Sequence, residues 1–227
     1  MPPATSPAVC STDEFFHELG PGGRAILDIA ETLFAEKGYD ATSMSEVARQ
    51  AGVSKANIFH HFGSKRGLYL AVIRAACRDS REALQQTRGG GESVADRLAT
   101  FQRHHIQSMF KRNRVTHLII REVLEATPER ARELTEEVFA EGFEQLVETV
   151  RSGQASGEFR SELDPALIAQ MIIAADVFLF QNQEVLRHFP RVTYADAPER
   201  YAAMVTDLLL NGCRVCHREP PASDEDD

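Results

Sequence analysis

The residues best suited to chemistry form one short segment, and the chemistry they suggest is hydrogen bonding to nucleic acid. The segment contains Ser54, Lys55, Ala56, Asn57, His60 and His61. An Asn amide can bond the edge of adenine, a Lys ammonium can bond guanine O6 and N7, and small aliphatic groups can contact the thymine methyl. A serine directly before these residues can cap a helix whose N-terminus then approaches a phosphate.

The charge pattern around this segment favours the same interpretation. Residues 47–78 contain six Lys or Arg and no Asp or Glu, so this stretch carries +6 within a chain of net charge -9. The remaining residues carry -15, which argues against a protein that binds nucleic acid through its global charge. A local basic patch can still hold a phosphate backbone, because its field acts over about a Debye length, ~10 Å. A solvated basic face without a partner is the alternative reading of such a run.

Two short predicted helices position the segment. Ser43 and Glu46 form a capping-box pattern at the start of the first helix. Gly52 turns the chain after it, because glycine accepts a backbone conformation that strains other residues. Ser54 caps the second helix, which ends near residue 61, so the pair reads as a helix-turn-helix. The apolar residues expected to fix the pair to a preceding helix are Met44, Val47, Val53, Ile58 and Phe62.

Helical periodicity continues through the rest of the chain, so the predicted fold class is all-α. Further helices are predicted near residues 24–37, 65–86, 92–110, 113–127, 128–152, 164–188 and 198–217. Glycines or prolines separate them, and no segment alternates as a strand does. With the two short helices the total is about nine, in a chain long enough to bury a core without disulfides or metals.

A longer string of residues surrounds the helix-turn-helix at fixed spacings. It reads Ala30-Glu31-Thr32-Leu33-Phe34, Gly38-Tyr39, Ala41-Thr42-Ser43, Val47-Ala48, Ala51-Gly52-Val53-Ser54-Lys55 and Ile58-Phe59-His60-His61-Phe62-Gly63-Ser64-Lys65. Residues 24–74 thereby resemble the DNA-binding domain of TetR-family (AcrR-like) transcriptional regulators. The resemblance covers about fifty of the 227 residues, and the rest of the chain agrees only in length and helical architecture.

The resemblance implies DNA-binding roles for ten residues. Those before the first short helix would hold a backbone phosphate, and those opening the second would meet base edges. The histidines would reach a base or a phosphate, and a lysine after the second helix would anchor a phosphate. The ten residues are Thr42, Ser43, Ser54, Lys55, Ala56, Asn57, Phe59, His60, His61 and Lys65.

Some neighbouring residues have competing interpretations. Phe59 matches a position that is commonly Tyr, and because it lacks the hydroxyl it can only pack on a sugar. For His61 the alternative is a packing or capping histidine, and for Asn57 a solvated helix residue. Arg66 and Arg74 are expected to be surface or ion-pair residues rather than DNA contacts.

The resemblance also implies a ligand-sensing and dimerising domain from about residue 80. The last two long helices, which look apolar around more than half their circumference, would pair across a two-fold axis, although internal core is the alternative use of such faces. A dimer would present two recognition helices to half-sites ~34–36 Å apart, hence to a palindromic double-stranded operator. The interface candidates are Leu167, Met171, Phe178, Tyr201, Met204, Val205, Leu208 and Leu209.

Aromatic residues, Met and a few polar groups share helix faces in this domain and suggest a pocket for an apolar or amphipathic small molecule. Simple core packing is the competing interpretation. Asp176 stands inside an apolar run, so it is a ligand or interface group or it turns outward. The pocket candidates are Phe101, His105, Met109, His117, Leu118, Arg121, Phe139, Phe143, Asp176 and Phe180.

We therefore expect a homodimeric, cytoplasmic DNA-binding regulator, a repressor that a small-molecule effector releases from its operator. No cofactor, metal site or enzymatic activity is expected. Membrane association is not expected either, because the first residues are not a signal peptide and no apolar run reaches about 18 residues. The expected domains are a disordered segment over residues 1–20, a helix-turn-helix domain over 21–66, a helical ligand-binding and dimerisation domain over 67–217, and an acidic disordered tail over 218–227.

One alternative is a redox- or metal-responsive regulator that uses Cys213 and Cys216, with His217 as a further ligand. The run Cys213-Arg214-Val215-Cys216-His217 also has the spacing of a haem attachment, but no secretory signal and no second axial ligand accompany it. An enzyme in the helical domain is the remote alternative, because no nucleophile, base and metal set is aligned.

Overall fold

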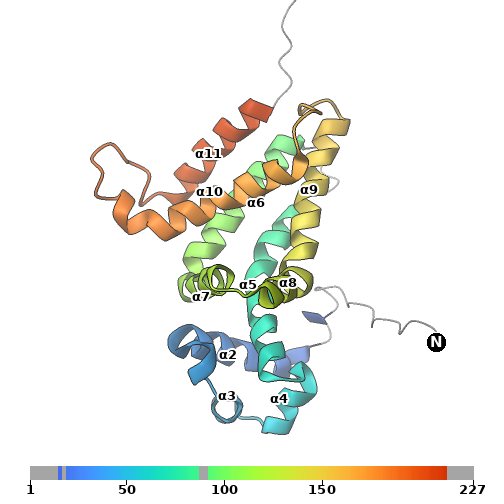
Figure 1. Cartoon of the computed structure of the whole chain (residues 1–227), viewed down its shortest axis with the longest axis vertical. Helices are drawn as coiled ribbons and strands as arrows, with labels where there is room; N and C mark the ends of the chain where they lie inside the picture. Colours follow the sequence, from blue (N-terminus) through green and yellow to red (C-terminus); the bar gives the residue numbers. More distant parts are fainter. Residues whose placement is uncertain (1–14, 17–18, 87–91, 214–227) are drawn as a thin grey trace, which may run out of the picture. The chain divides into compact units, whose positions relative to one another are not determined.

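The described residues of the computed structural model, 15–16, 19–86 and 92–213, are built from helices without a β-strand (Figure 1). The predicted all-α class is confirmed. Two compact units divide the chain, the first over residues 1–79 and 109–140 and the second over residues 80–108 and 141–227. The predicted acidic tail and Gly89-Gly90-Gly91 lie outside the described residues.

Nine helices are present in the described part when a continuous run interrupted by one π-turn is counted once. The first unit holds α2 Gly20–Ala41, α3 Met44–Ala51, α4 Lys55–Phe62, the start of α5 Lys65–Gln86, α7 Asn113–Leu124, α8 Pro128–Leu134 and the π-helix η1 Thr135–Phe139. The second unit holds most of α6 Val94–Lys111, then α9 Ala140–Ala155, α10 Pro165–Leu186 and α11 Pro198–Cys213.

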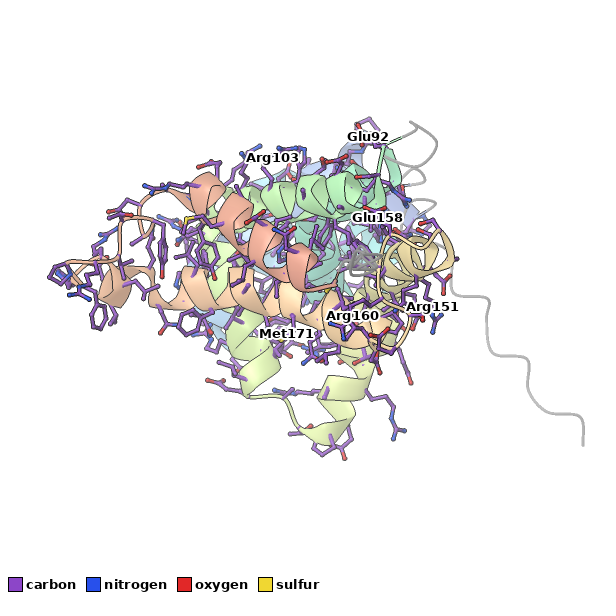
Figure 2. All side chains as sticks on the ribbon, turned by 90° about the horizontal axis from the view of Figure 1, so that it is seen from above. Glu92, Arg103, Arg151, Glu158, Arg160 and Met171 are labelled. Carbon is purple, nitrogen blue, oxygen red and sulfur yellow. The ribbon has the colours of Figure 1, made fainter. Side chains whose placement is uncertain are left out.

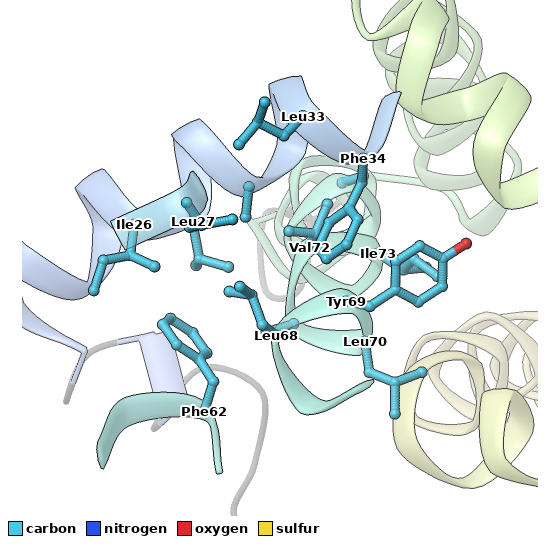
Figure 3. Close-up of a cluster of buried hydrophobic side chains, with 14 of the residues drawn as sticks. Ile26, Leu27, Leu33, Phe34, Phe62, Leu68, Tyr69, Leu70, Val72 and Ile73 are labelled. Carbon is cyan, nitrogen blue, oxygen red and sulfur yellow. The ribbon is translucent and has the colours of Figure 1, made fainter. Parts of the chain in front are cut away.

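The core of the first unit forms where α2 meets α5. Figure 3 shows Phe34 of α2 facing Tyr69 of α5, whose rings meet edge to face at 5.1 Å, and Leu68 between the two helices. All three side chains are at most 1% exposed. Phe16 and Leu19 are also buried here, so these two residues belong to the core and not to a disordered N-terminal segment.

Gly38 interrupts α2 where the sequence predicted a helix stop. Its φ of 82° and ψ of 172° are not helical, and one further turn follows up to Ala41. Positive φ is a conformation that glycine adopts without the steric cost that other residues incur. The chain is thereby redirected just before Ser43, the cap of α3.

The predicted helix over residues 128–152 is interrupted by the π-helix η1, which the sequence did not indicate. Arg74 of α5 lies against it and donates from Nε to the carbonyl of Glu137 at 2.7 Å and from Nη2 to the Glu137 carboxylate at 3.0 Å. The carbonyl of Glu137 inside this π-helix thus accepts from a side chain 63 residues away in the sequence.

In the second unit, the loop after α9 fixes the ends of two other helices (Figure 2). The Glu158 carboxylate accepts from the backbone N–H groups of Val94 at 2.8 Å and Ala95 at 2.9 Å, at the start of α6. An acidic group at a helix N-terminus accepts hydrogen bonds from the free N–H groups and interacts favourably with the positive end of the helix dipole. The N–H of Arg160 donates to the carbonyl of Cys213, at the end of α11, at 2.8 Å.

Asp176 is fully buried in the middle of α10 and is held by polar partners from α6. Gln102 Nε2 donates to its Oδ1 at 3.1 Å, and His105 Nδ1 lies 2.8 Å from its Oδ2. Gln102 in turn accepts a hydrogen bond from Thr206 of α11. The Tyr201 hydroxyl donates to the Ala175 carbonyl at 2.8 Å. The carboxylate therefore belongs to an internal network that joins three helices, and it does not turn outward.

By length and composition alone, α10 is apolar enough to cross a membrane, with 33% of its most apolar window buried. The core helix of a soluble protein passes the same test. Ile172 and Leu179 lie in the core of the second unit, whereas Leu167 and Phe178 are more than half exposed. The high apolar content of α10 thus reflects two apolar faces, one packed in the core and the other exposed.

Gly153 offers a test of packing in the second unit. A Cβ there would lie 2.5 and 2.8 Å from ring atoms of Phe159, which is 1% exposed, whereas a Cβ at Gly142 of the same helix would meet nothing within 4 Å. We expect Gly153→Ala to lower the free energy of unfolding by about 1–2 kcal/mol through overpacking. Gly142→Ala should raise it by about 0.5–1 kcal/mol through helix propensity. Urea denaturation followed by circular dichroism measures both. Stabilisation by both substitutions would show that the Phe159 ring has room to move.

The Asp176 network predicts a pH dependence. Burial raises the pKa of Asp176 above its ordinary value, against the opposing effect of the His105 and Gln102 hydrogen bonds. The folded state then binds this proton more tightly than the unfolded chain, so the stability it contributes is lost as the pH rises through the folded-state pKa. We expect the unfolding free energy of the wild type, minus that of Asp176→Asn, to fall from about pH 4 towards neutrality. Urea titrations at several pH values measure this difference, and a flat or rising difference would contradict a buried, desolvated carboxyl.

Candidate nucleic-acid interface

The segment before α3 begins the interface. Ser43 is exposed, and its Oγ accepts from the backbone N–H of Glu46 at 3.1 Å, as the sequence predicted. The second half of the expected capping box is not formed, because the Glu46 carboxylate pairs with Lys37 of α2 instead. Glu46 thus ties α3 to α2, and the Ser43 hydroxyl keeps its own proton available to an acceptor.

The turn between α3 and α4 has the predicted geometry. Gly52 has φ 67° and ψ 27°, a left-handed conformation, and its N–H donates to the carbonyl of Ala48. The N–H of Val53 donates to the same carbonyl at 3.0 Å. This closure lets α4 start directly after the turn.

Ser54 starts α4 by accepting from the N–H of Asn57 at 3.1 Å. Ile58 and Phe62 are buried, at 0% and 8% exposure, and fix one side of the helix. The opposite side is free of packing within the first unit. It presents the exposed side chains of Lys55, Ala56, Asn57, Phe59 and His60.

Phe59 is the large apolar residue of this exposed side, with 42% of its surface accessible. The Nζ of Lys55, one turn earlier, lies 5.8 Å from its ring centroid, within the range of a weak cation–π contact. The rings of His60 and His61 meet at 5.4 Å, and His61 is half-buried beside Phe62. His61 therefore combines packing against the helix core with access to solvent.

Thr42 differs from the other expected phosphate contacts. It is 1% exposed, and its hydroxyl donates to the Gly38 carbonyl at 2.8 Å, with the Leu33 carbonyl at 3.2 Å. The hydroxyl is therefore used inside the unit, and the expected phosphate contact of Thr42 stays a prediction. Thr42 holds the loop that carries Ser43.

Lys65 is half-buried at the start of α5 and has internal partners. Its Nζ donates to the carbonyl of Asp40 at 3.1 Å and lies 4.5 Å from the ring centroid of Tyr39. An ammonium has three donors, so these contacts leave capacity for a phosphate oxygen. The contact with Asp40 was not foreseen, because nothing in the sequence signals a pair 25 residues apart.

Arg66 and Arg74 are ion-paired, as the sequence reading expected. Arg66 contacts Glu122 and Glu133, and Arg74 contacts Glu137. All of these partners lie in the first unit, in α7, α8 and η1. The acidic partners had no local sequence signal, since they lie more than 50 residues away.

The expected dimer residues fall into two groups, while α10 and α11 pack against each other (Figure 1). One group is exposed and comprises Leu167, Met171, Phe178, Met204 and Leu208. The other comprises Tyr201, Val205 and Leu209, which are partly buried, with Leu209 packed against the core of the second unit. The α11 residues that were expected to form one interface face therefore differ in exposure, because Met204 and Leu208 are exposed whereas Tyr201, Val205 and Leu209 are partly buried.

The ten pocket candidates are divided between the two units. In the second unit, Phe101 stacks on His105 at 5.5 Å, and His105 contacts Asp176. Phe143 packs against the core that includes Phe101, and Phe180 is buried.

The five candidates of the first unit have other surroundings. Leu118 and Phe139 belong to its hydrophobic core, Met109 is buried, and His117 and Arg121 are exposed on α7. A surface hollow of about 290 Å³ is lined instead by Glu184, Val185, His188 and Phe189 near the end of α10.

The described residues give little support to a redox- or metal-responsive regulator that uses Cys213 and Cys216. Cys213 is buried, and burial raises the pKa of its thiol, which disfavours the reactive thiolate. Cys216 and His217 lie outside the described residues. Within residues 15–16, 19–86 and 92–213, no group of three or more His, Cys, Asp or Glu is placed to hold a metal ion.

Comparison with known proteins identifies both parts of the chain. A family model described as bacterial regulatory proteins, tetR family, matches residues 26–72, and one described as tetracyclin repressor-like, C-terminal domain, matches residues 91–181. The HTH-type transcriptional regulator YvkB of Bacillus subtilis is 41% identical over 69 residues, 30% of this chain and 36% of that protein. The negative transcriptional regulator IcaR of the biofilm operon icaADBC of Staphylococcus aureus is 46% identical over 49 residues, 22% of this chain and 26% of that protein.

The chain thus spans about a third or less of the length of these curated relatives. A solved structure of the transcriptional regulator FadR from Bacillus subtilis, in complex with stearoyl-CoA, has a TM-score of 0.68 at 21% identity. That similarity covers 84% of this chain and 99% of that chain, and it shows a shared fold. The resemblance inferred from residues 24–74 is thereby confirmed, and the second family model extends the match to residues 91–181: the chain belongs to the tetR family of bacterial regulatory proteins.

Proposed function

We propose that this chain is a sequence-specific repressor that binds a palindromic operator as a homodimer and leaves it when a small effector binds. The observation that carries the proposal is the construction of α4. Ser54 caps its start, and Ile58 and Phe62 bury one side, while the other side is exposed and polar apart from Ala56 and Phe59. A rigidly held helix with donors and acceptors on its free side suits the major groove.

The DNA contacts are assigned by the chemistry of the exposed groups. Lys55, Ala56 and Asn57 meet base edges, and His60 and His61 reach a base or a phosphate. Ser43 donates to a phosphate, and the N-terminal turn of α4 after Ser54 faces another. Lys65 adds a phosphate contact, and Phe59 packs on a sugar.

Dimerisation is assigned to the exposed apolar residues of α10 and α11. Leu208 is 74% exposed and Phe178 is 54% exposed, whereas a soluble monomer seldom leaves a contiguous apolar patch open. The same surface of a second copy covers such a patch by two-fold symmetry.

The effector is assigned to an apolar or amphipathic class. His105 keeps 20% of its side chain exposed beside the buried Phe101 ring, so a polar group lies next to apolar lining. The stearoyl-CoA bound to the Bacillus subtilis FadR is amphipathic, and the description of IcaR as a negative regulator supports repression. Effector binding would shift the population towards a form that no longer matches the operator.

Selection of bound fragments from sheared genomic DNA, at two salt concentrations, tests DNA recognition. We expect one or a few palindromic sites whose affinity falls steeply with salt. Asn57→Ala should cost about 1–3 kcal/mol of discrimination at one base pair, because it removes a base contact. Lys65→Ala should weaken all sequences alike and lower the salt slope by about one, because it removes a phosphate contact. Identical behaviour of the two variants would contradict these assignments, and recovery of no fragment would contradict the function.

The oligomeric state tests the assigned dimer surface. We expect Leu208→Glu to convert the dimer to monomer, because a charge would be buried at the interface without a partner. Leu124→Glu is the matched control, since Leu124 is 72% exposed on α7, and it should remain dimeric. Sedimentation velocity measures both. A monomeric wild type would contradict the homodimer, and a dimeric Leu208→Glu would place the interface elsewhere.

A further inference from the structure

Arg66 lies in an ion-pair cluster that the assigned DNA contacts do not use. Its Nη1 is 2.9 Å from Glu122 of α7, and its Nε and Nη2 are 2.8 and 2.7 Å from Glu133 of α8. Its guanidinium carbon lies 5.2 Å from the ring centroid of Tyr69 and 5.9 Å from that of Tyr39. The Tyr69 hydroxyl donates to the second oxygen of Glu122 at 3.1 Å. A planar guanidinium can hold two carboxylates and two rings together, which an ammonium cannot.

The cluster continues to the segment before α3 through Tyr39. Its ring is 4.9 Å from the Tyr69 ring, and Lys65 Nζ lies 4.5 Å above it. The same ammonium donates to the carbonyl of Asp40, three residues before Ser43. A contiguous set of contacts therefore runs from α7 and α8 to the loop that carries the assigned phosphate contact.

Further contacts fasten α7 to α2 along this route. Arg112, just before α7, pairs with Glu31 at 3.0 Å, and Arg114 of α7 pairs with Glu36 at 2.7 Å. All these residues belong to the first unit. A displacement of α7 or α8 would therefore act on the end of α2 and on the loop after it.

We propose that Arg66 is a positioning residue for DNA binding. By joining Glu122 and Glu133 next to Tyr39, it holds residues 40–43 in the conformation that presents Ser43 and Lys65 to a phosphate backbone. Arg66 itself makes no DNA contact in this role. The role rests on the proposed DNA-binding function and adds to it a means by which α7 and α8 control affinity.

Contiguity by itself does not demonstrate coupling, so the test must separate positioning from simple electrostatics. Removing Arg66 would weaken DNA binding under either explanation, since it removes a positive charge. Glu122→Gln separates them. Loss of a negative charge should raise DNA affinity through space, whereas loss of the Arg66 contact should lower it through the loop.

The variants are Glu122→Gln and Arg66→Lys, with Glu125→Gln as the control. Arg66→Lys preserves the charge but loses the forked geometry. Glu125 is exposed at the end of α7, so its substitution makes the same charge change as Glu122→Gln outside the cluster. Binding to the fragment recovered in the genomic selection is measured against salt concentration, and circular dichroism with thermal melting verifies folding.

We expect both cluster variants to lower affinity by about threefold to thirtyfold, with the salt slope lowered by at most about one, the share of the Lys65 contact. Glu125→Gln should leave affinity equal or slightly higher. Amide hydrogen exchange of the free proteins supplies a readout without DNA. Exchange over residues 39–46 should rise in Glu122→Gln and Arg66→Lys and stay as in the wild type in Glu125→Gln.

Three results would overturn the proposal. Wild-type or higher affinity of Glu122→Gln, with unchanged exchange over residues 39–46, would show that Arg66 forms only a structural ion pair. Wild-type affinity of Arg66→Lys would show that a positive charge at this position suffices and that the forked geometry positions nothing. A folded wild type that binds no fragment would remove the proposed function itself, and the positioning role with it.

Discussion

Burial of Ile58 and Phe62 beneath the exposed side of α4 is the interaction on which the rest of the interface depends. Full burial of such a side chain contributes roughly 1.5–3 kcal/mol. The caps at Ser43 and Ser54 and the left-handed Gly52 set where α3 and α4 begin and end. Only the apolar contacts with the core of α2 and α5 decide which side of α4 stays free. The polar residues on that side can read DNA because the other side is immobilised.

The fully buried Asp176 and the half-buried Arg66 follow a common physical rule. A desolvated charge is costly unless partners compensate it, so buried charges bring together helices that are distant in sequence. Asp176 draws α6 to α10 in the second unit, and Arg66 draws α7 and α8 to α5 in the first. These polar contacts specify an arrangement more than they add net stability.

Local features were predictable because their causes are local. The break of α2 at Gly38, the turn at Gly52 and the caps at Ser43 and Ser54 all lie where the sequence placed them. Features with distant causes were not predictable. The π-helix η1 meets an arginine from α5, and nothing between residues 128 and 152 signals it. The Thr42 side chain, adjacent to Ser43, turns inward because carbonyls of α2 accept its proton.

The sequence by itself determined the all-α class, the helix-turn-helix, its family and the residues on the free side of α4. Spacing, capping and glycine conformations act within a few residues and leave a readable pattern. Tertiary structure alone decided that Thr42 is buried, that Asp176 is held by Gln102 and His105, and that Arg66 joins two glutamates from other helices. The partners of Asp176 and Arg66 lie 56 or more residues away, and the carbonyls that bind Thr42 lie four and nine residues earlier, on the far side of the break at Gly38 or at that break. Desolvation selects such partners only when the helices have packed.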